Sequence, residues 1–153
     1  DTTILHTLEQ HEVDLVVLTG YLKKIGPKTL MAYRGRMINI HPSLLPRHGG
    51  QGMYGLRVHE AVLAAGEPAT GVTIHRVEAE YDKGMVLAQR TVPVKPDDTA
   101  ESLAGRVLVS EHALLVETVG KIARGEIPAL NQRSGQVSGG PFHLRVLNVT
   151  EIY

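Results

Sequence analysis

The sequence predicts a single α/β domain whose sheet begins with parallel strands. Helix-like and strand-like segments alternate up to His41, which is typical of βαβ units. Residues 14–20 form a short apolar run rich in β-branched side chains, as in a strand buried on both faces of a parallel sheet. The 153 residues, 42% of them apolar and 21% charged, suffice for one packed domain.

Hydrophobic periodicity and turn residues set the order of the predicted elements. That order is a helix over 2–11, strand 14–20, helix 27–35, strand 37–41, loop 42–55, helix 56–65, strands 70–79 and 85–94, a long helix from Asp98 to Gly125, and a strand-like piece over 144–147.

N-cap residues and an apolar stripe support the predicted helices. Pro27 suits the first helical position. Asp98 is the expected N-cap of the long helix, with Glu101 in the capping-box position three residues later. One stripe of that helix carries the side chains expected to face the core, which are Leu108, Leu115, Val119 and Ile122.

Alternation with a period of two supports the strand over 70–79. It places Val72 and Ile74 on one face, and Thr73, His75 and Val77 on the other. Taken alone, His75 is better explained as a core histidine, or as one that supports a site, than as a ligand. Pro93, late in the following strand, marks an edge strand.

Composition excludes several classes of function. The 16 basic and 16 acidic residues cancel, which argues against an electrostatic grip on nucleic acid or on an anionic membrane. The absence of cysteine excludes disulfides, a thiolate nucleophile and a Cys-based zinc site, and the eight histidines show no metal-ligand spacing, so no metal is expected. No long apolar run or secretion signal is visible, and we expect a cytoplasmic location.

Asn39 and His41 are the most informative residues. They lie two apart on a predicted strand, so their side chains share a face, beside Met37. They also lie at the carboxyl end of that strand, where open α/β sheets bind ligands. Paired hydrogen-bond donors on a rigid strand suit a developing oxyanion. Spacing alone leaves the plainer alternative open, with Asn39 as a turn residue and His41 as a core histidine.

Asp82 and the loop over 42–55 are weaker candidates. A carboxylate beside a histidine orients the ring and favours its charged form, whereas an Asx turn before Gly84 is the simpler explanation of Asp82. The glycines of the loop match neither a P-loop nor a dinucleotide fingerprint. Arg47 and His48 suit an anion, or simply solvent. We expect this loop to cover a substrate.

Residues 37–46, MINIHPSLLP, resemble the signature of the folate-dependent formyltransferases. Later landmarks of the family are matched in the same order by segments 70–75, 81–84 and 93–99 and by the pair Glu111-His112. This resemblance covers roughly residues 1–127. It implies a Rossmann-like, open, mostly parallel sheet flanked by helices, with an antiparallel C-terminal part. Pro42 favours the members that formylate glycinamide ribonucleotide over the tRNA enzymes and the deformylases.

The resemblance also implies a reaction. The formyl group of 10-formyltetrahydrofolate would pass directly to the amine of glycinamide ribonucleotide, a step of de novo purine biosynthesis. Asn39 and protonated His41 would hold the tetrahedral oxyanion. Asp82 would keep His41 charged and, through water, help to remove the amine proton.

Binding positions follow from the same resemblance. It implies contacts to the folate co-substrate from Leu18, Lys23, Lys24, Ile25, Leu30, Met37, Val77, Ala79 and Asp82, and contacts to the ribonucleotide from Leu22, Ile40, Pro42 and Glu111. The pteridine pocket would be apolar, and the turn over 79–82 would offer it backbone groups. Neither nucleic acid nor a membrane is expected as a partner, and a homodimer stays open.

We expect residues 1–153 to form one formyltransferase domain. Family members open with a strand and a Gly-Ser-Asn-type loop that binds the substrate phosphate at a helix N-terminus. The first segment here, Thr2 to Gly20, instead matches the middle of the family fold, so the N-terminal segment is expected to be absent from this chain. Two alternatives stay open, which are another folate-dependent formyltransferase or deformylase, and a non-catalytic fragment that binds folate.

Overall fold

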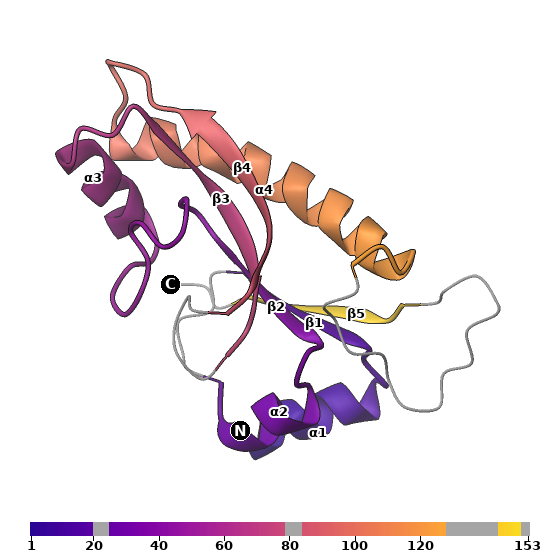
Figure 1. The fold of residues 1–153 in the computed structure, drawn as a ribbon. Coiled ribbons are helices and arrows are strands. Elements are labelled where there is room, and N and C mark those ends of the chain that lie inside the picture. Colours follow the sequence, from indigo (N-terminus) through magenta and orange to yellow (C-terminus); the bar gives the residue numbers. More distant parts are fainter. Residues whose placement is uncertain (20–24, 79–83, 128–143, 151–153) are drawn as a thin grey trace.

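The computed structural model describes residues 1–19, 25–78, 84–127 and 144–150. Five strands form one open sheet in the order β4-β3-β2-β1-β5, with helices on both sides (Figure 1). Along the chain the elements are α1 (Thr2–Gln10), β1 (Leu15–Thr19), α2 (Pro27–Ala32), β2 (Met37–His41), α3 (Leu56–Ala64), β3 (Ala69–Arg76), β4 (Val86–Pro93), α4 (Ala100–Ala123) and β5 (Val146–Thr150).

The sheet is mixed, with the parallel strands on one side. β1 pairs in parallel with β2 and with β5, whereas β3 pairs antiparallel with β2 and with β4. The predicted succession of parallel strands and then an antiparallel part is confirmed. The last strand, β5, returns to the parallel side and forms its edge. Every predicted helix and strand is present, with bounds that move by a few residues.

Two apolar cores lie on opposite faces of the sheet. On one face, α3 and α4 pack against a core that includes Val17, Ile38, Ile40, Val62 and Leu103. On the other face, α1 and α2 pack against a core that includes Leu8, Val16, Leu18, Tyr33 and Met37 (Figure 1). The alternation along β2 therefore sends its isoleucines toward α4 and Met37 toward α1.

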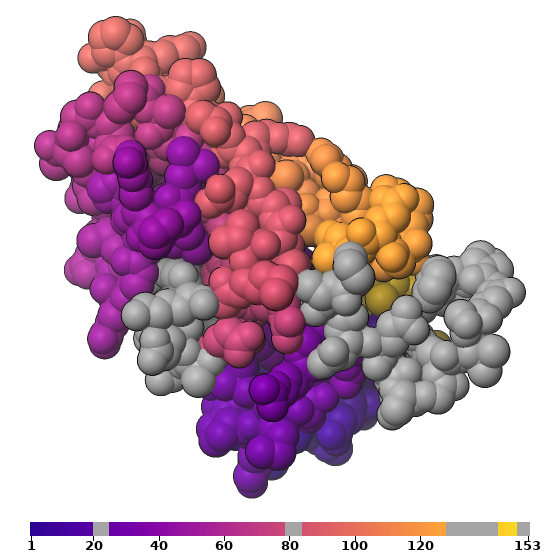
Figure 2. Space-filling view, viewed as in Figure 1, coloured from indigo at the N-terminus to yellow at the C-terminus, as the bar shows by residue number. Residues whose placement is uncertain are grey.

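β4 forms the other edge of the sheet. In Figure 2 it occupies the surface between the α3 side and the α4 side of the molecule. Most of its residues are exposed or half-buried, and Val92 is buried. The edge position predicted from Pro93 is thus confirmed. Within the part of the chain that the structure describes, no helix is long and apolar enough to cross a membrane.

The start of α4 differs from the prediction. The N-cap is Thr99 rather than Asp98. Its hydroxyl accepts a hydrogen bond from the Ser102 N–H, and the Ser102 hydroxyl accepts one from the Thr99 N–H, so Ser102 and not Glu101 completes the capping box. Asp98 instead forms a 2.6 Å salt bridge with Arg106. The hydrogen bonds that Arg106 donates to this carboxylate hold the pKa of Asp98 well below its usual range.

The buried stripe of α4 also differs. Its buried residues are Leu103, Val107, Leu114 and Thr118, with Leu115, Val119 and Ile122 half-buried beside them. Leu108 was expected in the core but is 48% exposed. Apolar side chains lie on more than one face of this helix, so periodicity alone does not determine which face meets the sheet.

Candidate active site

β2 delivers Asn39 and His41 to the carboxyl edge of the parallel strands. Asn39 is half-buried and His41 is only 5% exposed. Ile38 and Ile40 lie in the core on the α4 side, so strand alternation places Asn39 and His41 together on the other face. The strand then ends, and Pro42 begins the loop.

His75 orients the amide of Asn39. The two residues are cross-strand partners, and Asn39 Nδ2 lies 3.1 Å from His75 Nε2. His75 Nδ1 lies 2.9 Å from the carbonyl oxygen of Arg76, which can only accept, so Nδ1 carries a proton. In the neutral ring Nε2 then accepts from Asn39. The second Nδ2 hydrogen has no acceptor among the described residues and can donate to a substrate oxygen.

The loop after β2 fixes the ring of His41. His41 Nε2 donates a hydrogen bond of 2.8 Å to the main-chain carbonyl of His48. Arg47 donates to Glu67 at 3.1 Å, and His48 Nε2 lies 3.6 Å from the same carboxylate. Arg47 and His48 therefore face an acidic side chain of the protein.

His59 is a neighbour of the site that sequence reasoning missed. It lies on α3, is 5% exposed, and its Nδ1 has no hydrogen-bond partner among the described residues. Burial, and then the charge of His41, lower the pKa of His59, so its ring is neutral near pH 7. Its helical position predicts burial, but no sequence signal places it near His41.

The predicted pteridine-pocket residues lie together. Leu18, Ile25, Leu30, Met37 and Val77 belong to the apolar cluster that packs between the sheet and α1 and α2. Leu18 is also the cross-strand partner of Asn39. The apolar cluster therefore adjoins the oriented amide directly.

The other predicted ligand contacts are more dispersed. Pro42 follows His41 directly, whereas the Ile40 side chain is buried on the opposite face and leaves only its main chain for a ligand. Glu111 lies on α4, and no contact among the described residues joins it to Asn39. Burial raises the pKa of Glu111 to about 7.

Several predicted positions lie outside the described residues, namely Leu22, Lys23, Lys24, Ala79 and Asp82. Across the described ranges, no group of three or more histidine or acidic side chains is arranged to hold a metal ion.

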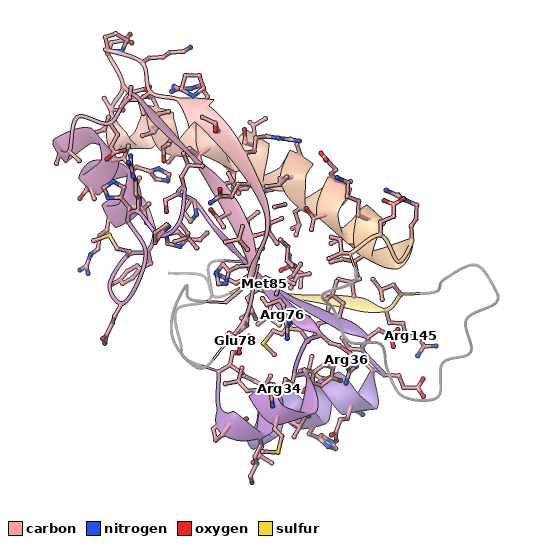
Figure 3. All side chains as sticks on the ribbon, in the orientation of Figure 1. Arg34, Arg36, Arg76, Glu78, Met85 and Arg145 are labelled. Carbon is pink, nitrogen blue, oxygen red and sulfur yellow. The ribbon has the colours of Figure 1, made fainter. Side chains whose placement is uncertain are left out.

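A second group of charged side chains lies at the opposite end of the parallel strands (Figure 3). Arg36, just before β2, donates to the carbonyl of Asp14 and lies 4.4 Å from the centre of the Tyr33 ring. Arg145, just before β5, pairs with Glu12 at 2.6 Å. These contacts tie α1 and α2 to the strand starts, and we assign Arg36 and Arg145 a structural role.

The family of the chain follows from comparison with known proteins. The family model described as "Formyl transferase" matches residues 1–119, from α1 into α4. The chain belongs to the formyl transferase family. β5 lies beyond the matched residues.

Two plant relatives of this formyl transferase chain share one name. It is 53% identical over 116 residues to phosphoribosylglycinamide formyltransferase, chloroplastic, of Vigna unguiculata, a match that covers 76% of this chain and 37% of the relative. It is 49% identical over 124 residues to the protein of the same name from Arabidopsis thaliana, covering 81% and 42%. The chain thus spans about two fifths of these curated relatives.

A solved structure extends the likeness to the fold. Phosphoribosylglycinamide formyltransferase from Streptococcus pneumoniae TIGR4 superposes with a TM-score of 0.72 at 39% identity. The match covers 79% of this chain and 64% of the bacterial one.

Proposed function

We propose that this chain belongs to an enzyme that transfers the formyl group of 10-formyltetrahydrofolate to the amine of glycinamide ribonucleotide. The names of its relatives and its family support this substrate pair. The observation that carries the proposal is the pair of fixed polar side chains at the end of β2, with Asn39 held by His75 and His41 held by the carbonyl of His48.

In the proposed reaction the amine nitrogen attacks the formyl carbon, and the formyl oxygen becomes an oxyanion. Asn39, through its second Nδ2 hydrogen, and protonated His41 stabilise this charge. Asp82 keeps His41 protonated and, through water, accepts the amine proton. The bond from the formyl carbon to folate N10 then breaks, N10 takes up a proton, and tetrahydrofolate leaves.

We also propose that the apolar cluster beside Asn39 receives the ring of the folate co-substrate. Ligand sites are mostly apolar, with a few polar groups that fix orientation. Leu18 and Met37 are buried members of this cluster and lie next to the Asn39 amide. We further propose that Lys23, Lys24 and the turn over 79–82 contact the folate, and that Leu22, the Ile40 main chain, Pro42 and Glu111 contact the ribonucleotide. A cytoplasmic location stays a prediction.

A transfer assay tests this function. The chain is assayed alone and joined to the part of the Streptococcus pneumoniae relative that the match leaves uncovered. We expect the joined protein to formylate glycinamide ribonucleotide. Transfer to a different amine would indicate another formyltransferase, and hydrolysis of 10-formyltetrahydrofolate without an amine would indicate a deformylase. Folate binding with no reaction would indicate a binding fragment.

A further inference from the structure

We propose that Gln89, on the edge strand β4, is a positioning residue for His41. It acts through Thr73 and through the loop over 42–48, and it has no role in contacting substrate. This inference rests on the proposed function, because His41 is the group that Gln89 positions.

His41, Thr73 and Gln89 form one row across three strands. His41 pairs with Thr73 between β2 and β3, and Thr73 pairs with Gln89 between β3 and β4. Directly opposed residues of an antiparallel pair share a face of the sheet. The row therefore runs from the catalytic strand through Thr73, which is fully buried, to the exposed Gln89.

The hydroxyl of Thr73 has no unused hydrogen-bonding capacity. It donates to the Ser43 carbonyl at 2.7 Å, and it accepts from the Leu45 N–H at 3.1 Å and from Gln89 Nε2 at 2.9 Å. A hydroxyl offers one hydrogen and two lone pairs, so all three are engaged. Gln89 gives its other Nε2 hydrogen to the Leu45 carbonyl at 3.1 Å. One amide thus fixes both the Thr73 rotamer and the Leu45 peptide.

A short turn carries this constraint to His41. The Ser43 hydroxyl donates to the Arg47 carbonyl at 2.6 Å, and the Arg47 N–H donates to the Leu44 carbonyl at 3.1 Å. The next carbonyl along the chain, that of His48, accepts the hydrogen bond from His41 Nε2. A shift of the turn therefore moves the acceptor that holds the catalytic ring.

Gly71 allows the loop to approach β3 closely. A Cβ atom at this position would collide with the Leu44 side chain and with the Arg90 carbonyl. The loop therefore lies directly against the backbone of β3 at Gly71, two residues from Thr73. The hydrogen bonds of Thr73 and the close contact of Leu44 with Gly71 thus hold the loop against the same part of β3.

Replacing Gln89 by methionine removes both donors and keeps the length of the side chain. We expect kcat for formyl transfer to fall about tenfold, since small misplacements of a catalytic group are costly, with substrate KM unchanged. The limb of the pH–rate profile that reports His41 should also move. Thr73→Val should lower kcat in the same way. Thr73→Ser keeps the hydroxyl and should keep the wild-type kcat.

Thr70→Val is the matched control. Thr70 is also a buried threonine of β3, 2% exposed, but its hydroxyl has no partner among the described residues. This variant should keep the kcat and the pH–rate profile of the wild-type protein. If Thr73→Val does not fold, Gln89→Met at the exposed edge still tests the proposal.

Nitrogen NMR of the His41 ring gives a readout that needs no turnover. Gln89→Met should weaken the Nε2–H hydrogen bond and speed exchange of that proton with water, whereas Thr70→Val should not. If Gln89→Met alters the His41 signal but the wild-type protein has no transferase activity, the proposed function is overturned and the positioning role is supported. An unchanged His41 signal in Gln89→Met would overturn the positioning role, whatever the rate.

Discussion

Replacing Glu111 by glutamine should stabilise the protein, and more strongly as the pH rises. Burial on α4 raises the pKa of Glu111 to about 7, against an ordinary value of 4.5. Between these values the folded chain holds a proton that the unfolded chain has released, so the free energy of unfolding falls as the pH rises. The interval from 4.5 to 7, at about 1.4 kcal/mol per pH unit, corresponds to roughly 3 kcal/mol.

Urea titrations at about pH 5 and about pH 8 measure this effect. Glutamine does not ionise, so the stability advantage of Glu111→Gln over the wild-type protein should grow by roughly 2.5 kcal/mol between the two conditions, because a small part of the effect is already present at about pH 5. Glu101→Gln, at an exposed glutamate on the same helix, is the control and should show no such growth. An advantage of Glu111→Gln that does not change with pH would refute the reasoning.

Two further predictions concern other buried or paired groups. Thr70→Val should raise the free energy of unfolding by about 1 kcal/mol, measured in urea, because it removes a buried hydroxyl without a described partner; a loss of stability would show that the hydroxyl is satisfied. Asp98→Asn should lower the urea midpoint at neutral pH, because it breaks the ion pair with Arg106. The pKa of Asp98 is lower in the folded than in the unfolded protein, so this deficit should shrink as the pH falls below the ordinary aspartate pKa and vanish below the folded-state pKa. The matched control Asp97→Asn, at an exposed aspartate, should show no comparable deficit.

Local sequence signals predicted the strand that carries Asn39 and His41 well. Pro42 cannot continue a central strand, and the apolar residues around Asn39 demand burial on both faces, so the bounds 37–41 followed from the sequence. The period of two then placed Asn39 and His41 on one face without any knowledge of the fold.

Contacts between distant segments could not be predicted in this way. His75 reaches Asn39 only because β3 pairs with β2 in one particular register. His59 lies near His41 only because α3 packs against the sheet and α4. The exposure of Leu108 depends on which face of α4 meets the sheet. Each of these depends on packing across long sequence separations, which periodicity does not encode.

The rate of formyl transfer after Asn39→Ala tests the proposed catalytic site at the end of β2 most directly. Loss of one oxyanion donor typically costs about 100- to 1000-fold in kcat, and we expect a decrease of that size with little change in KM. Asn148→Ala, at an exposed asparagine on β5, is the matched control and should keep the wild-type rate. A full rate in Asn39→Ala would contradict the role of this amide in binding the oxyanion.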